Sequence, residues 1–366
     1  RGGCGGVLPA HAMLQSPCQS FVDRLECFPP PAGRVASLEV KGSIMAANSR
    51  KILVIGAVGQ IGTDLTPALR ERYGPDNVVA SGHRTMPSQA FRMAGPFETV
   101  DATDMEGLRA LVRKHHIGTI YNLATVLSGD GEKDPDLAWH VNVGSLKNVL
   151  DLGVEFAMSQ IFWPSSIAVF GPTTPRIDTP QRTVLEPTTI YGVTKVAGEN
   201  LCNYYFVKHG LDVRSLRYPG LVTYKTFSGG GTSDYSVEIF IDAFKHGHYT
   251  CFVSAETAMP LMYMDDAIRA TIDVMAADAS KMTVRNSYNV SALSFTAGEL
   301  AEEVAKRIDG FTFDFKPDFR QAIADSWPDS MDDSVACRDW GWKPEYDLAT
   351  LVDTMLEGIR NSPLVR

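Results

Sequence analysis

Short apolar runs and longer amphipathic segments alternate along most of the chain. The runs are rich in β-branched residues and predict buried parallel strands, whereas the longer segments have the period of helices that bury one face. The strands are expected at 51–56, 77–81, 97–101, 117–124, 159–163 and 213–217. Helices are expected between them, so strand and helix repeat five or more times. This repetition predicts an α/β fold with a Rossmann-like, doubly wound parallel sheet.

The alternation becomes irregular after residue 225, and this change predicts a second, smaller lobe. We expect a Rossmann domain at 48–225, to which the stretch 259–292 returns. The remaining stretches, 226–258 and 293–366, are expected to form a C-terminal α/β lobe that closes over the carboxyl edge of the sheet and binds the substrate. The proline-rich loop 171–187 is a candidate lid over the same edge.

Residues 1–47 differ from the rest because they mix Gly, Pro, Ser and Cys without periodicity. Their arginines suit a mitochondrial targeting leader, although Asp23, Glu26 and Glu39 weaken the match. Met45, just before the first strand, is an alternative starting point. We therefore interpret the segment as a leader or an unstructured extension, and expect a mitochondrial location or otherwise a cytoplasmic one.

The charge and the cysteine content limit the kinds of ligand and partner that we expect. The net charge of -9 and the pI near 5.4 argue against a nucleic acid as partner. The six cysteines show neither a Cys-x-x-Cys pair nor a regular ligand spacing, so no metal site is expected. No run approaches 18 apolar residues, so we expect no transmembrane helix and no membrane partner.

A glycine-rich turn follows the first strand directly and opens an amphipathic helix. Free backbone N–H groups and the positive end of that helix would face a pyrophosphate, and glycines allow the close approach. We therefore expect a dinucleotide to bind here. The residues expected to contact it at the turn are Gly56, Gly59, Gln60, Ile61 and Gly62.

The ends of the next strands are expected to hold the rest of the dinucleotide. The second strand ends without an acid, at Ser81 followed by His83 and Arg84. A small residue followed by Arg often accommodates a 2′-phosphate, so the preference between NAD and NADP stays open; alternatively, Arg84 points to solvent. Asp101, after the third strand, suits the adenine amino group. Further contacts are expected from Leu123 and Ala124, which end the fourth strand.

Tyr191 and Lys195 are four residues apart, which on a helix places both side chains on one face. An ammonium beside a phenol favours the phenolate, so it lowers a pKa that is about 10 in model peptides. The pair is therefore a candidate general base for an alcohol. The alternative is an ordinary core aromatic with a solvated lysine one turn on. Asn142, an unfavourable residue inside the helix expected at 135–156, is interpreted as a support for nearby backbone.

Three features converge on the carboxyl edge of the predicted sheet: the glycine turn, Ser165 with Ser166, and the Tyr191/Lys195 pair. In this order and spacing they resemble the extended short-chain dehydrogenase/reductase family over essentially all of 51–360. The resemblance implies that Tyr191 takes the proton and that Lys195 lowers its pKa and binds the nicotinamide ribose. It further implies that Ser166 holds the substrate hydroxyl.

Within that family, the stretches 229–235, 261–266 and 326–342 resemble the L-threonine 3-dehydrogenases of the short-chain type. This resemblance implies zinc-independent oxidation of L-threonine to 2-amino-3-ketobutyrate with NAD, by a homodimer that pairs the helices near 135–156 and 188–209. It adds Pro219 to the cofactor contacts. The substrate contacts that it implies are Ser128, Ser166, Tyr191, Thr232 and Asp234.

Two assignments near the substrate have alternatives. Asp234 either pairs with the ammonium or caps a helix, and Arg176 meets the carboxylate, gates the lid or is solvated. Two other functions also remain: a nucleotide-sugar epimerase or dehydratase of the same family, and a dinucleotide-sensing protein without activity. The short loop 229–235 disfavours the first, because nucleotide sugars require a longer binding lobe. The retained Tyr191 and Lys195 disfavour the second.

Overall fold

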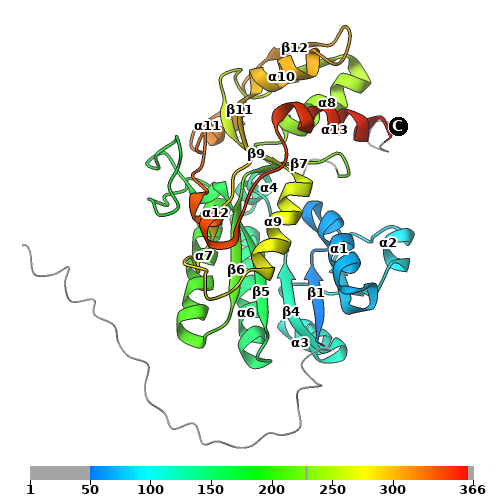
Figure 1. Cartoon of the computed structure of the whole chain (residues 1–366), viewed down its shortest axis with the longest axis vertical. Coiled ribbons are helices and arrows are strands. Elements are labelled where there is room, and N and C mark those ends of the chain that lie inside the picture. Colours follow the sequence, from blue (N-terminus) through cyan, green and yellow to red (C-terminus); the bar gives the residue numbers. More distant parts are fainter. Residues whose placement is uncertain (1–49, 227–229, 362–366) are drawn as a thin grey trace, which may run out of the picture. The chain divides into compact units, whose positions relative to one another are not determined.

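A seven-stranded parallel sheet organises the chain, whose computed structural model describes residues 50–226 and 230–361 (Figure 1). The strand order is β10-β6-β5-β4-β1-β2-β3, and all neighbours are parallel. The predicted doubly wound class is confirmed. The strands are β1 (Lys51–Ile55), β2 (Val78–Gly82), β3 (Phe97–Thr99), β4 (Ile117–Asn122), β5 (Gln160–Ser166), β6 (Val213–Tyr218) and β10 (Tyr288–Asn289).

The strand order reverses between β1 and β4. The chain moves outward from β1 to β3 and then returns to place β4 on the other side of β1. At such a reversal the connections leave in opposite directions, which opens a crevice at the carboxyl ends of the strands. The fold therefore provides a ligand site beside the turn that follows β1.

Helices cover both faces of this sheet, since successive strand residues point to opposite sides. Ile52 and Val54 of β1 pack in the core that contains α1 and α9, whereas Leu53 and Ile55 pack in the core that contains α3, α6 and α7. The helices on the two faces are α1 (Gln60–Tyr73), α3 (Met105–His115), α6 (Ser145–Glu155), α7 (Ile190–His209) and α9 (Met264–Ala276). The short α2 (Gln89–Met93) and α12 (Ser334–Trp340) complete this part of the chain.

The helix expected at 135–156 contains one irregular turn. α5 (Pro135–Trp139) continues through a π-helical turn, His140–Gly144, into α6, and the residues at both junctions keep right-handed helical angles. The predicted helix is therefore confirmed, with a π-bulge where Asn142 lies. A further short helix, α4 (Ser128–Lys133), precedes it.

A second group of elements follows β6 and shares its own apolar core. It contains the three-stranded sheet β11-β9-β7 and the parallel pair β12-β8. The strands are β7 (Gly220–Val222), β8 (His248–Cys251), β9 (Ala258–Tyr263), β11 (Leu293–Thr296) and β12 (Thr312–Phe315). The helices are α8 (Tyr235–His246), α10 (Ala297–Ala305), α11 (Arg320–Ala324) and α13 (Leu348–Arg360).

The stretch 259–292 is divided between the two groups. Its first strand, β9, belongs to the small sheet, whereas α9 packs against α1 and β10 extends the large sheet beside β6. The division into a Rossmann domain and a substrate lobe stays a prediction. The leader expected at 1–47 lies outside the described residues.

Candidate active site

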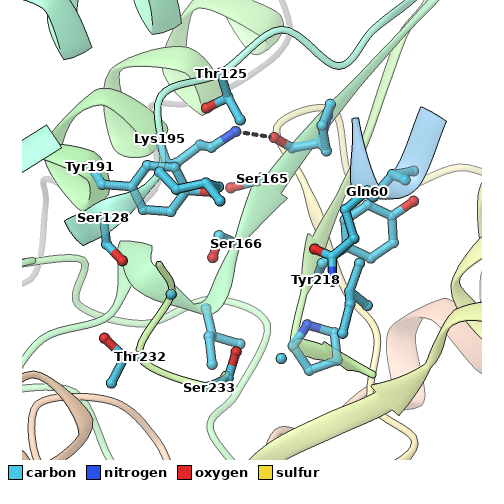
Figure 2. Close-up of a pocket in the computed structure, with 18 of the residues that line it drawn as sticks. Gln60, Thr125, Ser128, Ser165, Ser166, Tyr191, Lys195, Tyr218, Thr232 and Ser233 are labelled. Atoms are coloured by element: carbon cyan, nitrogen blue, oxygen red, sulfur yellow. Dashed lines mark hydrogen bonds between the residues drawn. The ribbon is translucent and has the colours of Figure 1, made fainter. Parts of the chain in front are cut away.

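A cavity of about 140 Å³ lies at the carboxyl edge of the large sheet, beside the strand-order reversal (Figure 2). It is lined by the residues that end or follow β4, β5 and β6, by the starts of α1 and α4, by α7, and by the loop before α8. Ten residues predicted for the site line it: Gln60, Ile61, Leu123, Ser128, Ser166, Tyr191, Lys195, Pro219, Thr232 and Asp234.

Lys195 lies buried beneath the cavity. Its Nζ donates a hydrogen bond to Pro164 O at 2.6 Å and lies 4.5 Å from the centroid of the Trp163 ring. The Tyr191 ring centroid is 5.3 Å from the same nitrogen, so the pair shares one face of α7 as the spacing predicted. Burial lowers the pKa of Lys195 to about 7, and Cys202 and Glu199 act in the opposite direction.

The predicted lowering of the Tyr191 pKa is wrong for this structure. Burial raises the pKa of Tyr191 to about 12, and a hydrogen bond with Ser166 only partly opposes this. The ammonium of Lys195 is directed to the carbonyl of Pro164, and the desolvation of the phenol dominates. A phenolate at Tyr191 therefore requires more positive charge nearby than the spacing of Tyr191 and Lys195 alone predicts.

The two serines at the end of β5 have different partners. Ser165 Oγ donates to Glu199 Oε1 at 2.7 Å, whereas Ser166 hydrogen-bonds Tyr191 and accepts from Ala168 N at 3.2 Å. Neighbouring strand residues point to opposite sides, which explains the difference. Ser166 is therefore the hydroxyl beside the tyrosine.

Asn142 supports the edge of the cavity from inside the π-helical turn. Its Oδ1 accepts from Val126 N at 2.7 Å and Thr125 Oγ1 at 3.1 Å. Its Nδ2 donates to Val126 O at 3.1 Å and to Thr194 Oγ1 at 3.0 Å. Three of these bonds hold the chain after β4 and the fourth reaches α7, so the predicted supporting role of Asn142 is confirmed.

The residues predicted for the substrate surround one space (Figure 2). Ser128 and Thr232 are buried, and Asp234 accepts from Gly230 N and Gly231 N at 2.8 and 2.7 Å. Asp234 lies at the N-cap position of α8, but its side chain makes no capping bond to that helix. Burial raises the pKa of Asp234, and the two glycine N–H groups oppose this.

The glycine turn fits a dinucleotide pyrophosphate. Gly56 has φ +79°, in the left-handed region that favours glycine, and a Cβ on Gly62 would lie 2.6 Å from Ala57 Cα. Gly59, the N-cap of α1, provides no side-chain cap, so the first N–H groups of the helix remain available to an anion. Ala124 N lies beside Gly56, 3.2 Å from where a Cβ would stand.

Five predicted residues do not line the cavity. Gly56, Gly59, Gly62 and Ala124 form or adjoin the turn, and Asp101 lies further along the edge of the sheet. Asp101 accepts from Thr103 N and Thr103 Oγ1, both at 2.8 Å, and is 3.6 Å from His83 Nε2.

Both arginines considered at the sequence level lie outside the cavity. Arg84 is exposed, and Arg176 pairs with Asp329 and donates to Asp325 O. Arg176 thereby fastens the loop 171–187 to the segment that contains Trp327. Trp327 lines the cavity, and sequence reasoning did not select it although it lies in the resembling stretch 326–342.

The other lining residues were not predicted as direct contacts. Ser165 was expected at this edge beside Ser166, Leu127 adjoins the predicted Ser128, and the remainder are common residues at strand ends or in the loop before α8. They are Thr125, Pro164, Ile167, Tyr218, Gly220, Leu221, Gly231 and Ser233. Among the described residues, no group of three or more His, Cys, Asp or Glu is arranged to hold a metal, and no helix is long and apolar enough to span a membrane.

A doubly wound sheet with a glycine turn at its strand-order reversal defines a dinucleotide-binding protein of the Rossmann type. The particular family follows from comparison with known proteins. The model of the NAD dependent epimerase/dehydratase family matches residues 52–291, and the chain belongs to that family. It is therefore an enzyme of a family that uses NAD, the cofactor that the turn fits.

Individual proteins with similar chains support this membership. A curated relative from Staphylococcus haemolyticus (strain JCSC1435), named an uncharacterized epimerase/dehydratase, is 47% identical over 84% of this chain and 97% of its own length. The solved GalE-like L-threonine dehydrogenase from Cupriavidus necator (holo form) is 50% identical with a TM-score of 0.81, covering 84% of this chain and 99% of that one. A monomeric L-threonine 3-dehydrogenase from a metagenome database (apo form) is 45% identical with a TM-score of 0.82, covering 86% and 100%.

Proposed function

We propose that this enzyme oxidises L-threonine to 2-amino-3-ketobutyrate with NAD. The observation that carries the proposal is that Tyr191, Lys195 and Ser166 meet at one small cavity beside the glycine turn. The similarity to two solved proteins named as threonine dehydrogenases supports the choice of substrate.

The chain's own residues bind the reactants and move the proton. The turn from Gly56 to Gly62 would hold the pyrophosphate of NAD, and Lys195 would contact the nicotinamide ribose. When bound, NAD supplies the hydride acceptor. Ser166 would hold the substrate hydroxyl oxygen, and Tyr191 Oη would take its proton.

Because the pKa of Tyr191 is raised, its phenolate must be stabilised by a positive charge nearby. Below about pH 7 the side chain of Lys195 is an ammonium and supplies such a charge within one turn of α7. As the pH rises through that value, the lysine becomes neutral and its stabilisation of a phenolate is lost. Proton transfer to Tyr191 therefore depends on what keeps Lys195 charged.

The cavity favours a small substrate. The lining beside Tyr191 supplies small polar side chains from Ser128, Ser166 and Thr232 and the carboxylate of Asp234, which suit a compact polar substrate. We assign Ser128, Thr232 and Asp234 to the amino and carboxylate groups of threonine. Both bonds of Asp234 go to Oδ2, which leaves Oδ1 for an ammonium.

The direct test is NAD reduction, followed by nicotinamide absorbance, with L-threonine, L-allo-threonine and L-serine. We expect turnover with L-threonine and a loss of about 10²–10⁴-fold in Tyr191→Phe. Tyr204→Phe, an exposed tyrosine on the same helix, is the matched control and should keep full activity. Absence of turnover with threonine would overturn the substrate, and an active Tyr191→Phe would overturn the base.

Two further expectations belong to this proposal. We propose a homodimer, supported by exposed apolar side chains on α5 and α7, although one similar protein is named as monomeric. The mitochondrial location stays a prediction that rests on residues 1–47, and the curated relatives at 46–47% identity are bacterial. Fluorescence imaging of the full chain, with and without residues 1–47, tests the location.

A further inference from the structure

A buried ion pair lies directly beneath the candidate site, between Glu199 on α7 and Arg217 on β6. Arg217 Nε donates to Glu199 Oε1 at 2.8 Å and Nη2 donates to Oε2 at 2.7 Å. The two side chains are 1% and 2% exposed. A bidentate contact of this kind fixes the orientation of the carboxylate as well as its charge.

The arginine is itself held from several sides. Its Nη1 donates to Gln181 O and to Asn289 Oδ1, both at 3.0 Å. Asn289 in turn donates to Thr179 O at 3.0 Å and Asp332 O at 3.2 Å. The carboxylate of Glu199 is therefore anchored to the sheet and to the loop 171–187, and has little freedom to rotate.

Two groups of the site depend on this fixed carboxylate. Ser165, next to Ser166 at the end of β5, donates to Glu199 Oε1 at 2.7 Å. Lys195 precedes Glu199 by one helical turn, so the two side chains share a face of α7. We propose that Glu199 is a positioning residue, which holds the end of β5 in place and keeps Lys195 in its ammonium form.

The charges around Lys195 support this role. Burial lowers the pKa of Lys195, and the two side chains that oppose it are Cys202 and Glu199. Burial raises the pKa of Cys202, so that thiol is uncharged at neutral pH. Of the two, Glu199 therefore supplies the negative charge.

Charged groups on neighbouring elements contact α7 at residues other than Lys195. Glu132 of α4 accepts from Ile190 N, and Asp151 of α6 bonds the hydroxyl of Tyr205. Arg217 of β6 meets Glu199 itself, while β5 offers Lys195 only the Trp163 ring and the Pro164 carbonyl. Because a buried ion pair adds little net stability compared with apolar packing, stability alone does not account for Glu199 and Arg217.

The test follows the titration of Lys195 directly, by NMR of the full-length protein labelled with ¹³Cε-lysine. The Lys195 resonance is assigned by its absence from Lys195→Arg. The variants are Glu199→Gln, the paired change Glu199→Gln with Arg217→Gln, and Ser165→Ala. The paired change avoids leaving a buried guanidinium without its partner, which destabilises the fold, and gives a second readout if Glu199→Gln alone is unstable.

We expect the midpoint of the Lys195 titration to move to lower pH by roughly one unit in Glu199→Gln, and by less in the paired variant, because the paired change also removes the positive charge of Arg217. It should stay in place in Ser165→Ala, which removes the contact and keeps the charge. An unchanged midpoint in Glu199→Gln would overturn the proposal, and so would a paired variant whose midpoint moves to higher pH, since Arg217 would then outweigh Glu199 at Lys195. An equal shift in Ser165→Ala would also overturn it, since repacking and not charge would then be the cause.

The kinetic consequence rests on the proposed function. With L-threonine, Glu199→Gln should lose kcat with little change in KM, and its decline in activity with rising pH should begin at lower pH. If the unmodified enzyme does not oxidise threonine, the proposed function fails while the titration still decides the role of Glu199.

Discussion

At the scale of single residues, the unusual group is Lys195, a lysine buried in the folded protein with its pKa lowered to about 7. In the unfolded chain the ordinary pKa is 10.5, so between these values the unfolded state binds a proton that the folded state does not. The free energy of unfolding contributed by this group should therefore increase as the pH rises from about 7 to 10.5, and decrease as the pH falls through that window.

The variant Lys195→Met removes this dependence. Across the window, the free energy of unfolding of the unmodified protein should rise relative to the variant by up to ~1.4 kcal/mol per pH unit. Urea denaturation at a series of pH values measures the difference. The control is Lys208→Met, which replaces an exposed lysine of the same helix. Its free energy of unfolding should run parallel to that of the unmodified protein across the window. Parallel curves for Lys195→Met and the unmodified protein would contradict the prediction.

The sequence identified the residues whose spacing has chemical meaning and missed those that only the fold brings near. Tyr191 and Lys195 could be selected because one helix fixes their separation. Trp327 could not, since it reaches the cavity through long-range contacts such as that between Arg176 and Asp329. The direction of the Tyr191 pKa was also missed, because spacing reveals a neighbouring charge but not the extent of burial.

At the scale of elements, the contact between β1 and α1 decides whether the cofactor turn can form. A Cβ on Gly62 would overlap the backbone of Gly56 and Ala57, which cannot move aside as a flexible side chain can. Gly62→Ala should separate the helix from the strand, destabilise the protein by about 1–3 kcal/mol and weaken NAD binding at least tenfold. Calorimetry and chemical denaturation measure the two effects.

A matched substitution shows whether the effect is specific to that contact. Gly144 has helical φ of -63°, and the nearest atom to an added Cβ is His140 Nδ1 at 3.8 Å. Gly144→Ala should leave NAD affinity unchanged and be neutral or slightly stabilising. Equal NAD affinities for the Gly62 variant and the unmodified protein would contradict the assigned role of the turn.

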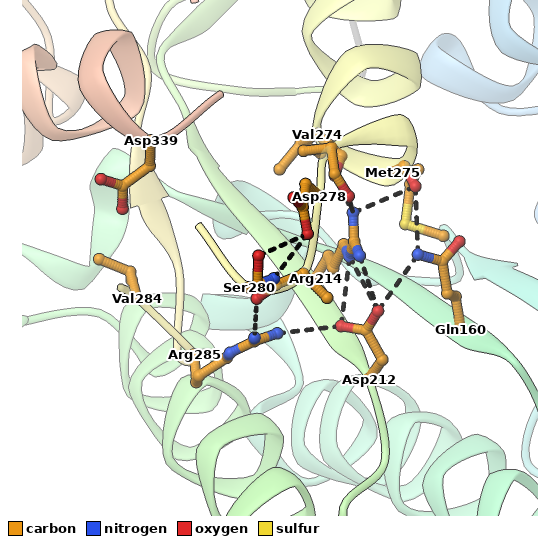
Figure 3. Close-up of polar contacts among 12 residues, drawn as sticks. Gln160, Asp212, Arg214, Val274, Met275, Asp278, Ser280, Val284, Arg285 and Asp339 are labelled. Atoms are coloured by element: carbon orange, nitrogen blue, oxygen red, sulfur yellow. Dashed lines mark hydrogen bonds and ion pairs between the residues drawn. The ribbon is translucent and has the colours of Figure 1, made fainter. Parts of the chain in front are cut away.

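Strand β6 was predictable from its apolar pattern, whereas the partners of its buried arginines were not. Every residue in it is buried, including Arg214 and Arg217, whose charges would disfavour such a strand without partners. Arg214 bonds Asp212 and donates to Val274 O, Met275 O and Ala277 O at the end of α9. Figure 3 shows the contacts of Arg214 with Asp212, Val274 and Met275. The strand was predictable from its apolar neighbours, but the three carbonyl partners lie 60 to 63 residues further along the chain.

At the scale of the whole molecule, the large sheet was predictable and the second group of elements was only outlined. The strands of the sheet are apolar runs that alternate regularly with helices, so each element has a local signal. In contrast, β8 pairs with β12, and His248 lies opposite Thr312 far along the chain. Short strands that pair over such distances have little local signal, which explains why only a smaller lobe could be predicted there.

An exposed apolar face on α5 and α7 is the expected interface between two copies of the chain. Trp139 on α5 and Val193, Tyr204 and Val207 on α7 are between 41% and 74% exposed, an apolar surface that pairing with a second copy would cover. Light scattering should give twice the chain mass, and Val207→Glu should shift the protein to the monomer. Met93→Glu, an equally exposed apolar residue on α2, is the control and should leave the dimer intact. A monomeric unmodified protein, or equal dissociation by both substitutions, would exclude this face as the interface.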